Sequence, residues 1–173
     1  PPRYLERPGC AGIDPAFPTR KMLCGMMVAV DDSLANITAA YRALGLWDRT
    51  VIIFSTDNGG NPDTGGNNAP LRGMKGTTWE GGVRVPLLVR APWERASVGR
   101  MARGLAELVD VYPTVVELAG LPPAVDQGLD GVSLKPFFAD PSRVALPTAA
   151  AQGTRNKTLA FSQSVSYTHL TLP

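Results

Sequence analysis

The sequence VIIFSTDNGG, residues 51–60, decides the class of fold, because an apolar run ends abruptly in polar residues and glycines. Apolar residues in succession, without alternation, are typical of a parallel strand that is covered on both faces. Asp57 and Asn58 follow at its carboxyl end, where open α/β sheets bind their ligands. Gly59 and Gly60 allow the backbone to turn sharply and to approach a ligand without a Cβ clash. The stretch therefore predicts a strand that delivers two polar side chains to a binding edge.

Helix and strand patterns on both sides of this strand indicate an α/β fold. Apolar residues recur at steps of three and four over residues 21–44, which predicts one long amphipathic helix. Residues 83–92, VRVPLLVRAP, predict a second strand, and residues 105–120 predict a further helix with a break before Pro113. Two strands are too few for a stable sheet. The chain is therefore expected to be an incomplete part of a mixed, mainly parallel sheet with its helices.

Two further segments connect or follow these elements. Residues 57–82 are rich in glycine, and a structureless connection of that length in a compact domain is usually functional or disordered. Residues 129–138, LDGVSLKPFF, are expected to form a short turn that packs on the rest of the chain.

The composition limits the classes of function. The chain has 173 residues, about one domain, of which 44% are hydrophobic and 18% charged, as in globular proteins. Its net charge of +2 comes without a cluster of Lys or Arg, so no nucleic-acid partner is predicted. No apolar stretch approaches the roughly 18 residues of a membrane span, so none is predicted.

The polar residues after the first strand admit two interpretations. An Asp carboxylate and an Asn carbonyl supply two hard oxygen ligands, which suit Ca²⁺ or Mg²⁺. Taken alone, however, Asp57 and Asn58 are better explained as a turn that closes a strand. Lys75, between Gly73 and Gly76, is suited to bind sulfate or phosphate oxygens, although an ordinary surface lysine is the simpler interpretation.

A resemblance to a known family favours the ligand-binding interpretation of these residues. The sequence STDNGG, followed by GGNNAPLRGMKGTTWEGGVRVPLLVRAP, closely resembles the type I sulfatases of the alkaline-phosphatase-like superfamily. Within them it is most similar to the N-acetylgalactosamine-4-sulfatase (arylsulfatase B) group. The resemblance covers residues 1–138 and extends over the segments YLERP, GMMVAVDDSLANITAAYRALGLWDRT, LVDVYPTVVELAGL and LDGVSLKPFF. It implies the α/β sandwich of that superfamily, with this chain as the C-terminal portion of the catalytic domain.

The resemblance also implies roles for individual residues. Asp57 and Asn58 match the third and fourth ligands of one Ca²⁺ ion. Lys75 matches the lysine that contacts the substrate sulfate and neutralises developing charge, which makes it both catalytic and substrate-binding. Trp79 is a weaker candidate for a substrate contact, and a packed hydrophobic anchor is the preferred interpretation.

Other charged residues near these positions are interpreted as structural. Arg72 and Glu80 are expected to pair across the loop, and Arg84 has no assigned role. Asp31 and Asp32 lie within the predicted helix and are interpreted as a solvated face. The family's own Asp-Asp metal pair belongs at the end of its first strand, so these two do not match it.

The family's nucleophile has no counterpart in this chain. It is a cysteine in Cys-x-Pro-Ser-Arg that is converted to formylglycine, or a serine in its place, and Cys10 and Cys24 lack that context. Residues 139–143, ADPSR, have alanine at the nucleophile position. The resemblance thus implies a sulfuric ester hydrolase that acts on a sulfated sugar or aryl sulfate and needs a formylglycine-generating enzyme. The chain alone is expected to be inactive, and a 4-sulfated galactosamine is the first substrate expected.

Two other functions stay open at this point. One is a phosphatase or phosphodiesterase of the same superfamily, although the absence of histidine around Asp57 argues against the usual two-metal site. The other is a non-catalytic sulfatase-like module that binds anions without turnover. The resemblance implies a periplasmic or secreted protein in bacteria and a lysosomal one in animals, and the residues do not choose between them.

The cysteines and the C-terminal residues complete the sequence predictions. Cys10 and Cys24 could form a disulfide in an exported protein, or they could be buried free thiols. Residues 139–164 are interpreted as the start of a C-terminal subdomain or a linker. Residues 165–173, VSYTHLTLP, resemble the translation of a DNA-sequencing adapter and are excluded as an artefact. The sole histidine, His169, lies there and receives no role.

Overall fold

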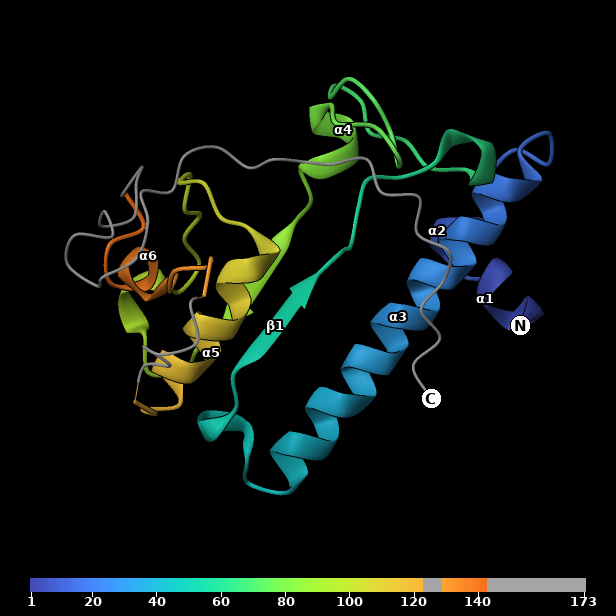
Figure 1. Cartoon of the computed structure of the whole chain (residues 1–173). Coiled ribbons are helices and arrows are strands. Elements are labelled where there is room, and N and C mark those ends of the chain that lie inside the picture. The colour runs from blue at the N-terminus through green and yellow to red at the C-terminus, as the bar shows by residue number, and fades with distance from the viewer. Residues whose placement is uncertain (123–128, 143–173) are drawn as a thin grey trace. The chain divides into compact units, whose positions relative to one another are not determined.

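The computed structural model describes residues 1–122 and 129–142 (Figure 1). Its elements follow the predicted order of helix, strand, connection, strand and helix. The α-helices are α1 (Pro2–Leu5), α2 (Pro8–Ala11), α3 (Pro18–Ala43), α4 (Glu80–Val83), α5 (Val111–Leu118) and α6 (Lys135–Ala139), and the strands are β1 (Ile52–Ser55) and β2 (Leu87–Arg90). Single turns of 3-10 helix are η1 (Trp47–Arg49), η2 (Pro62–Thr64), η3 (Arg95–Ser97) and η4 (Leu108–Asp110).

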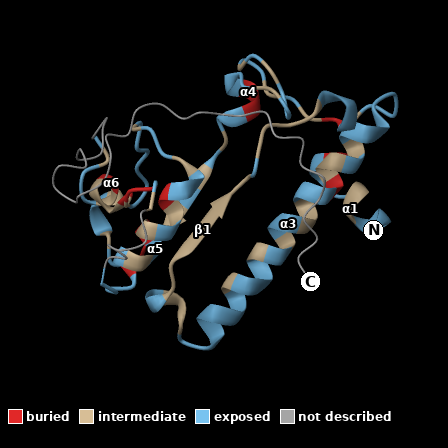
Figure 2. Cartoon of the chain, in the orientation of Figure 1, coloured by how far each residue is buried: buried red, intermediate tan, exposed pale blue. Residues whose placement is uncertain are grey.

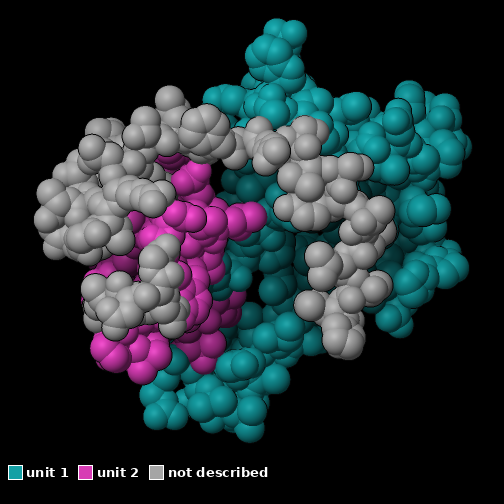
Figure 3. All heavy atoms as spheres, viewed as in Figure 1, with its two compact units in different colours: residues 1–49, 53–89, 162–173 teal, residues 50–52, 90–161 magenta. Residues whose placement is uncertain are grey.

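The chain divides into two compact units, which Figure 3 shows in teal and magenta. The described part of the first unit comprises residues 1–49 and 53–89, and that of the second comprises residues 50–52, 90–122 and 129–142. All predicted site residues belong to the first unit. The predicted linker beyond residue 142 and the predicted artefact at 165–173, with His169, lie outside the described residues.

Helix α3 confirms the predicted long helix and begins slightly earlier. Pro18 occupies its first turn, where the missing N–H of proline is not needed for a helical hydrogen bond. At the other end Gly45 adopts a φ of 67°, which favours glycine. The Gly45 N–H donates to the Arg42 carbonyl at 3.0 Å, and the Leu46 N–H donates to the Tyr41 carbonyl at 2.9 Å. These paired bonds satisfy the last helical carbonyls and explain why the helix ends there.

The apolar side chains of α3 are largely exposed among the described residues (Figure 2). Gly25 is its only buried residue, whereas Met22 is 60% exposed. The helix has 26 residues and a window of mean hydropathy 1.2, so by length and composition it could cross a membrane. The sequence prediction of no membrane span considered uninterrupted apolar runs, and this criterion does not decide it. Core helices of soluble proteins meet the same criterion.

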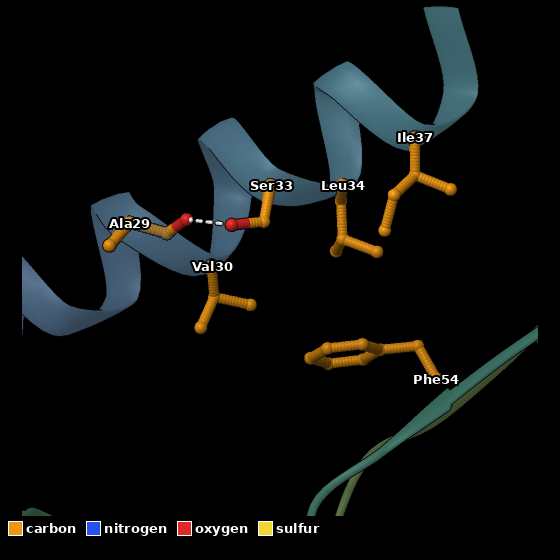
Figure 4. A pocket seen from close by; sticks show the side chains of 6 residues that line it. All are labelled: Ala29, Val30, Ser33, Leu34, Ile37 and Phe54. Atoms are coloured by element: carbon orange, nitrogen blue, oxygen red, sulfur yellow. Dashed lines mark hydrogen bonds between the residues drawn. The ribbon is translucent and has the colours of Figure 1, made fainter. Parts of the chain in front are cut away.

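An apolar hollow of about 290 Å³ lies between α3 and β1 within the first unit (Figure 4). The ring of Phe54 on β1 faces the side chains of Val30 and Leu34 on α3. The one hydroxyl in its lining, that of Ser33, donates to the Ala29 carbonyl at 2.8 Å and is satisfied within the helix. The hollow therefore offers apolar surface only.

Helix α2 is fixed to α3 by a disulfide. Cys10 is fully buried and is bonded to Cys24 of α3, with a Cα–Cα distance of 5.7 Å. Of the two states left open by the sequence, the structure therefore has the disulfide. The two cysteines are 14 residues apart in the sequence. Closing a loop of about this length stabilises a fold by about 3 kcal/mol in the chain-entropy description. Arg7 also forms an ion pair with Asp32 at 2.9 Å, so Asp32 is not simply solvated as predicted.

The two strands form one sheet, and their contacts run in opposite directions. The Ser55 hydroxyl donates to the Pro86 carbonyl at 3.1 Å. Further along the chain from Ser55, the Gly59 N–H donates to the Gly82 carbonyl at 3.0 Å, which lies before Pro86. Later residues of the β1 segment therefore contact earlier residues of the β2 segment, which makes this strand pair antiparallel. Residues 56–86 contain only the short η2 and α4, neither long enough to form a crossover, so the chain returns in the reverse direction.

Both strands lie where the sequence predicted them. They are shorter and more exposed to solvent than predicted. The strand predicted over residues 83–92 covers only Leu87–Arg90, because Val83 belongs to α4 and Pro86 cannot donate to a ladder. All residues of β1 are partly exposed, although the sequence predicted cover on both faces. A two-stranded sheet is too small to provide that cover.

A buried polar cluster organises the second unit. The Asp110 carboxylate accepts hydrogen bonds from the Glu107 N–H at 2.8 Å and the Val132 N–H at 2.9 Å. The Thr114 hydroxyl accepts from the Leu134 N–H at 2.8 Å and donates to the Asp110 carbonyl at 2.6 Å. Both side chains are fully buried, so these bonds satisfy groups that water cannot reach. They hold the segment around Val132 and Leu134 against α5.

The packing of residues 129–138 and the start of α5 test two further predictions for this unit. The predicted packing of residues 129–138 is confirmed, since Val132, Leu134 and Phe137 are buried. The predicted break before Pro113 was wrong. Helix α5 begins at Val111, so Pro113 lies in its first turn, where the absent N–H costs no hydrogen bond.

Candidate functional site

Asp57 and Asn58 leave β1 as predicted and form a local turn. The Asn58 N–H donates to Asp57 Oδ1 at 2.9 Å, so one carboxylate oxygen closes the turn. Asp57 is exposed and Asn58 is half-buried. Within the described residues, neither Asp57 Oδ2 nor the Asn58 side chain has a hydrogen-bond partner. The turn interpretation is thus realised, and it leaves oxygen atoms of both residues available to a ligand.

The loop after these residues is anchored on α3. Gly65 is buried with a φ of 89°, and its carbonyl accepts from Arg20 Nη1 at 2.8 Å. A Cβ on Gly65 would lie 2.7 Å from the Arg20 backbone nitrogen. The segment therefore packs directly on the helix, and the structure replaces the predicted structureless connection with an ordered loop.

The Asn68 side chain closes this loop on itself. Its Oδ1 accepts from the Gly60 N–H at 2.7 Å, and its Nδ2 donates to the Gly60 carbonyl at 2.8 Å. The same Nδ2 donates to the Gly73 carbonyl at 3.2 Å. Asn68 received no role from the sequence, because its function depends on the loop folding back between Gly60 and Gly73. Its position in a glycine-rich, polar segment was the only available signal.

Lys75 lies in the returning part of the same loop. Its N–H donates to the Gly60 carbonyl at 3.3 Å, which places the Lys75 backbone against the segment that follows Asn58. The side chain is exposed and forms no ion pair among the described residues. The structure thus brings the lysine and the Asp-Asn pair, predicted separately, into one loop cluster.

Close glycine contacts hold the two arms of the loop together. The Gly81 N–H donates to the Arg72 carbonyl at 2.7 Å. A Cβ on Gly59 would overlap the Gly81 carbonyl oxygen, and a Cβ on Gly81 would overlap the Gly73 carbonyl oxygen. The backbones can approach this closely only because these positions lack side chains.

We expect Gly81→Ala to lower the free energy of unfolding by about 2–3 kcal/mol, because forced overpacking costs about that much. The added methyl group would overlap the Gly73 carbonyl and lie 2.8 Å from the Arg72 carbonyl. The measurement is the unfolding midpoint of the intact protein in guanidinium chloride. Gly12→Ala is the matched control, since a Cβ there meets nothing within 4 Å. Equal midpoints for the two variants would contradict the close packing.

The charged residues around α4 pair differently from the prediction. The Arg72 guanidinium lies over the Trp79 ring at 3.8 Å, and Glu80 pairs with Arg84 at 3.2 Å. The predicted Arg72–Glu80 pair was wrong. Glu80 and Arg84 are separated by one helical turn of α4, which brings them together, and the ring of Trp79 offers Arg72 a cation–π partner. Trp79 is 50% exposed and stays a candidate for a substrate contact.

The predicted ligands Asp57 and Asn58 are too few to hold a metal ion by themselves. Among them, no group of three or more His, Cys, Asp or Glu side chains is placed to hold a metal ion. Asp57 and Asn58 would supply two hard oxygen ligands, and Ca²⁺ takes about six to eight. Their chemistry fits such an ion, and its other ligands would come from outside the described residues.

Comparison with known proteins identifies relatives of the matched region. A model of the Sulfatase family matches residues 19–121. Arylsulfatase J of Mus musculus is 38% identical over 115 residues, which cover 66% of this chain and 19% of that protein. The N-acetylgalactosamine-6-sulfatase of Homo sapiens is 36% identical over 111 residues, which cover 62% of this chain and 21% of that protein. The chain spans about a fifth of the length of these relatives.

Solved structures give a consistent result. Ps i-CgsB in complex with k-i-k-neocarrahexaose aligns with a TM-score of 0.66 and 37% identity over 71% of this chain and 27% of that chain. The phosphonate monoester hydrolase of Agrobacterium radiobacter aligns with a TM-score of 0.57 and 31% identity over 79% of this chain and 24% of that chain. The match to the family model contains nearly all of α3, which favours a helix of the domain over a membrane span.

Proposed function

The chain belongs to the sulfatase family, and we propose that it contributes metal ligands and a sulfate-binding lysine to a hydrolase of sulfate esters. The alkaline-phosphatase-like fold predicted from the sequence is confirmed by the structural neighbours. The observation that carries the proposal is the bond from the Lys75 N–H to the Gly60 carbonyl, which joins the lysine loop to the strand end with Asp57 and Asn58.

Each of these residues has a separate task in the proposed reaction. The Lys75 ammonium stabilises negative charge on the sulfate oxygens as the ester bond breaks. The carboxylate of Asp57 and the amide oxygen of Asn58 would hold a Ca²⁺ ion, which when bound would supply Lewis-acid chemistry at the sulfate group. The reaction consumes water and the sulfate ester and releases an alcohol and sulfate.

The nucleophile comes from outside the described residues in this proposal. Cys10 and Cys24 are bonded to each other, so neither offers a thiol for conversion to formylglycine. We propose a formylglycine made from another Cys or Ser of the intact protein by a formylglycine-generating enzyme.

A sulfated glycan is the proposed substrate class. One structural neighbour was solved with a bound oligosaccharide, k-i-k-neocarrahexaose, and one relative is an N-acetylgalactosamine-6-sulfatase. The relatives differ in their named substrates, so the narrower arylsulfatase B assignment and a 4-sulfated galactosamine substrate are proposals for direct assay.

The experiment is a comparison of esters with the intact protein that contains this chain. We expect faster turnover of p-nitrophenyl sulfate than of p-nitrophenyl phosphate or a phenylphosphonate ester, with activity lost to a chelator and restored by Ca²⁺. The phosphonate monoester hydrolase among the structural neighbours makes the phosphorus esters the necessary comparison. Faster phosphorus-ester turnover would reassign the reaction. Sulfate binding without turnover would indicate a binding module instead.

A further inference from the structure

We propose that Asn68 is a positioning residue that holds the metal-binding strand end and the Lys75 loop in register. This inference rests on the function proposed above and concerns how that site is assembled. Asn68 itself has no assigned contact with substrate or metal. It acts through two backbone segments, one following Asn58 and the other preceding Lys75.

The hydrogen bonds of Asn68 use both ends of its amide. Oδ1 accepts from the Gly60 N–H at 2.7 Å, while Nδ2 donates to the carbonyls of Gly60 at 2.8 Å and Gly73 at 3.2 Å. The opposite orientation of the amide would direct its oxygen at two carbonyl oxygens. A side chain that accepts one bond and donates two in this way must be an amide, because a carboxylate has no donor at neutral pH, a hydroxyl has only one, and an aliphatic group has neither.

These bonds join the two functional arms of the loop. Gly60 shortly follows Asn58 and Gly73 shortly precedes Lys75, so one amide fixes the backbone near both. The Gly60 carbonyl accepts from both Asn68 Nδ2 and the Lys75 N–H. Asn68 is half-buried and its three bonds are partly buried, which limits replacement by water. A shift of Asn68 would therefore displace the metal ligands relative to the lysine.

The neighbouring asparagine provides a matched control. Asn67 is exposed, and its Oδ1 accepts from the Ala69 N–H at 2.9 Å, a bond that an aspartate could also accept. Asn68→Asp and Asn67→Asp each add one negative charge to the same loop. Only Asn68→Asp removes donors to Gly60 and Gly73 and sets a carboxylate against their carbonyl oxygens.

We expect Asn68→Asp to lower kcat/KM for p-nitrophenyl sulfate by about 10–100-fold, the usual effect of losing a supporting partner around a metal site. Calorimetric titration with Ca²⁺ should show affinity weakened by a similar factor, without reference to turnover. Asn67→Asp should leave both quantities near those of the wild type. Asn68→Leu, similar in size and uncharged, should weaken both quantities through the loss of its bonds alone.

A double-mutant cycle with Lys75→Ala separates positioning from general destabilisation. If Asn68 acts by placing Lys75, Asn68→Asp should reduce turnover less in the Lys75→Ala background than in the wild type. Fully additive effects, or equal effects of Asn67→Asp and Asn68→Asp, would overturn the proposal. Should Asn68→Asp fail to fold, Asn68→Leu and Asn68→Ser carry the same comparison. An inactive wild type would instead refute the proposed function, so the two failures are distinguishable.

Discussion

Lys75→Ala is expected to lower kcat/KM for p-nitrophenyl sulfate by about 10²–10³-fold in the intact protein, as for other lost electrostatic stabilisers. The Lys75 side chain is exposed and forms no ion pair among the described residues, so its charge is not already neutralised there. An ammonium is a compact charge that can approach sulfate oxygens without a fixed plane. Steady-state kinetics with saturating Ca²⁺ provide the measurement.

The pattern of the kinetic constants tests the role of Lys75 more closely. A fall in kcat that matches the fall in kcat/KM would indicate that the charge acts in the transition state, whereas a rise in KM alone would indicate ground-state binding. Lys21→Ala on α3 removes the same charge outside the site loop and should have little effect. Unchanged turnover of the sulfate ester by Lys75→Ala would refute the assigned role.

The long elements of the fold could be predicted because their signals are local. The period of apolar residues in α3 and the glycine after it specify a helix whatever it packs against. The short helices α1, α2 and α4 were not predicted, because four residues are too few to show a period. The direction of β2 was also not predictable, because it depends on how residues 56–86 return rather than on the strand's own sequence.

The candidate site residues were chosen from their chemistry and from the resemblance to a family. How these residues are arranged in space could not be predicted in that way. Asp57, Asn58 and Lys75 carry groups suited to a cation and an anion, which can be read residue by residue. Asn68 and the Arg72–Trp79 pair act through contacts that exist only after the loop has closed. The glycine content indicated a loop, but not which carbonyl each glycine would meet.

The described residues leave apolar surface of α3 exposed and offer only two candidate metal ligands. Met26 on α3 is 54% exposed and Leu44, just after the helix, is 70% exposed, while the chain spans about a fifth of the length of its relatives. A short chain buries only part of the surface of its helices. Both the apolar cover of α3 and the remaining metal ligands are therefore expected from the intact protein, and experiments on the site should use it.

Asp57→Asn is expected to have an effect as large as the loss of Lys75, and it separates the two interpretations of the Asp-Asn turn. The variant keeps an Oδ1 that can accept from the Asn58 N–H, so the 2.9 Å turn bond should persist. It removes the negative charge that a Ca²⁺ ligand contributes, and Ca²⁺ affinity depends strongly on the charge of the ligands. We expect sulfate-ester turnover to fall by about 10²–10³-fold at a fixed low Ca²⁺ concentration.

The measurement is a Ca²⁺ titration followed both by turnover and by calorimetry. Asp57→Asn should need a higher Ca²⁺ concentration for half-maximal activity and should show weaker binding by calorimetry. Asp63→Asn is the matched control, because Asp63 is an exposed carboxylate in the same loop that no proposal assigns to the metal. If Asp57→Asn and Asp63→Asn bind Ca²⁺ and turn over substrate alike, then Asp57 serves only to close the strand. In that case the position of Lys75 beside this turn would need a different explanation.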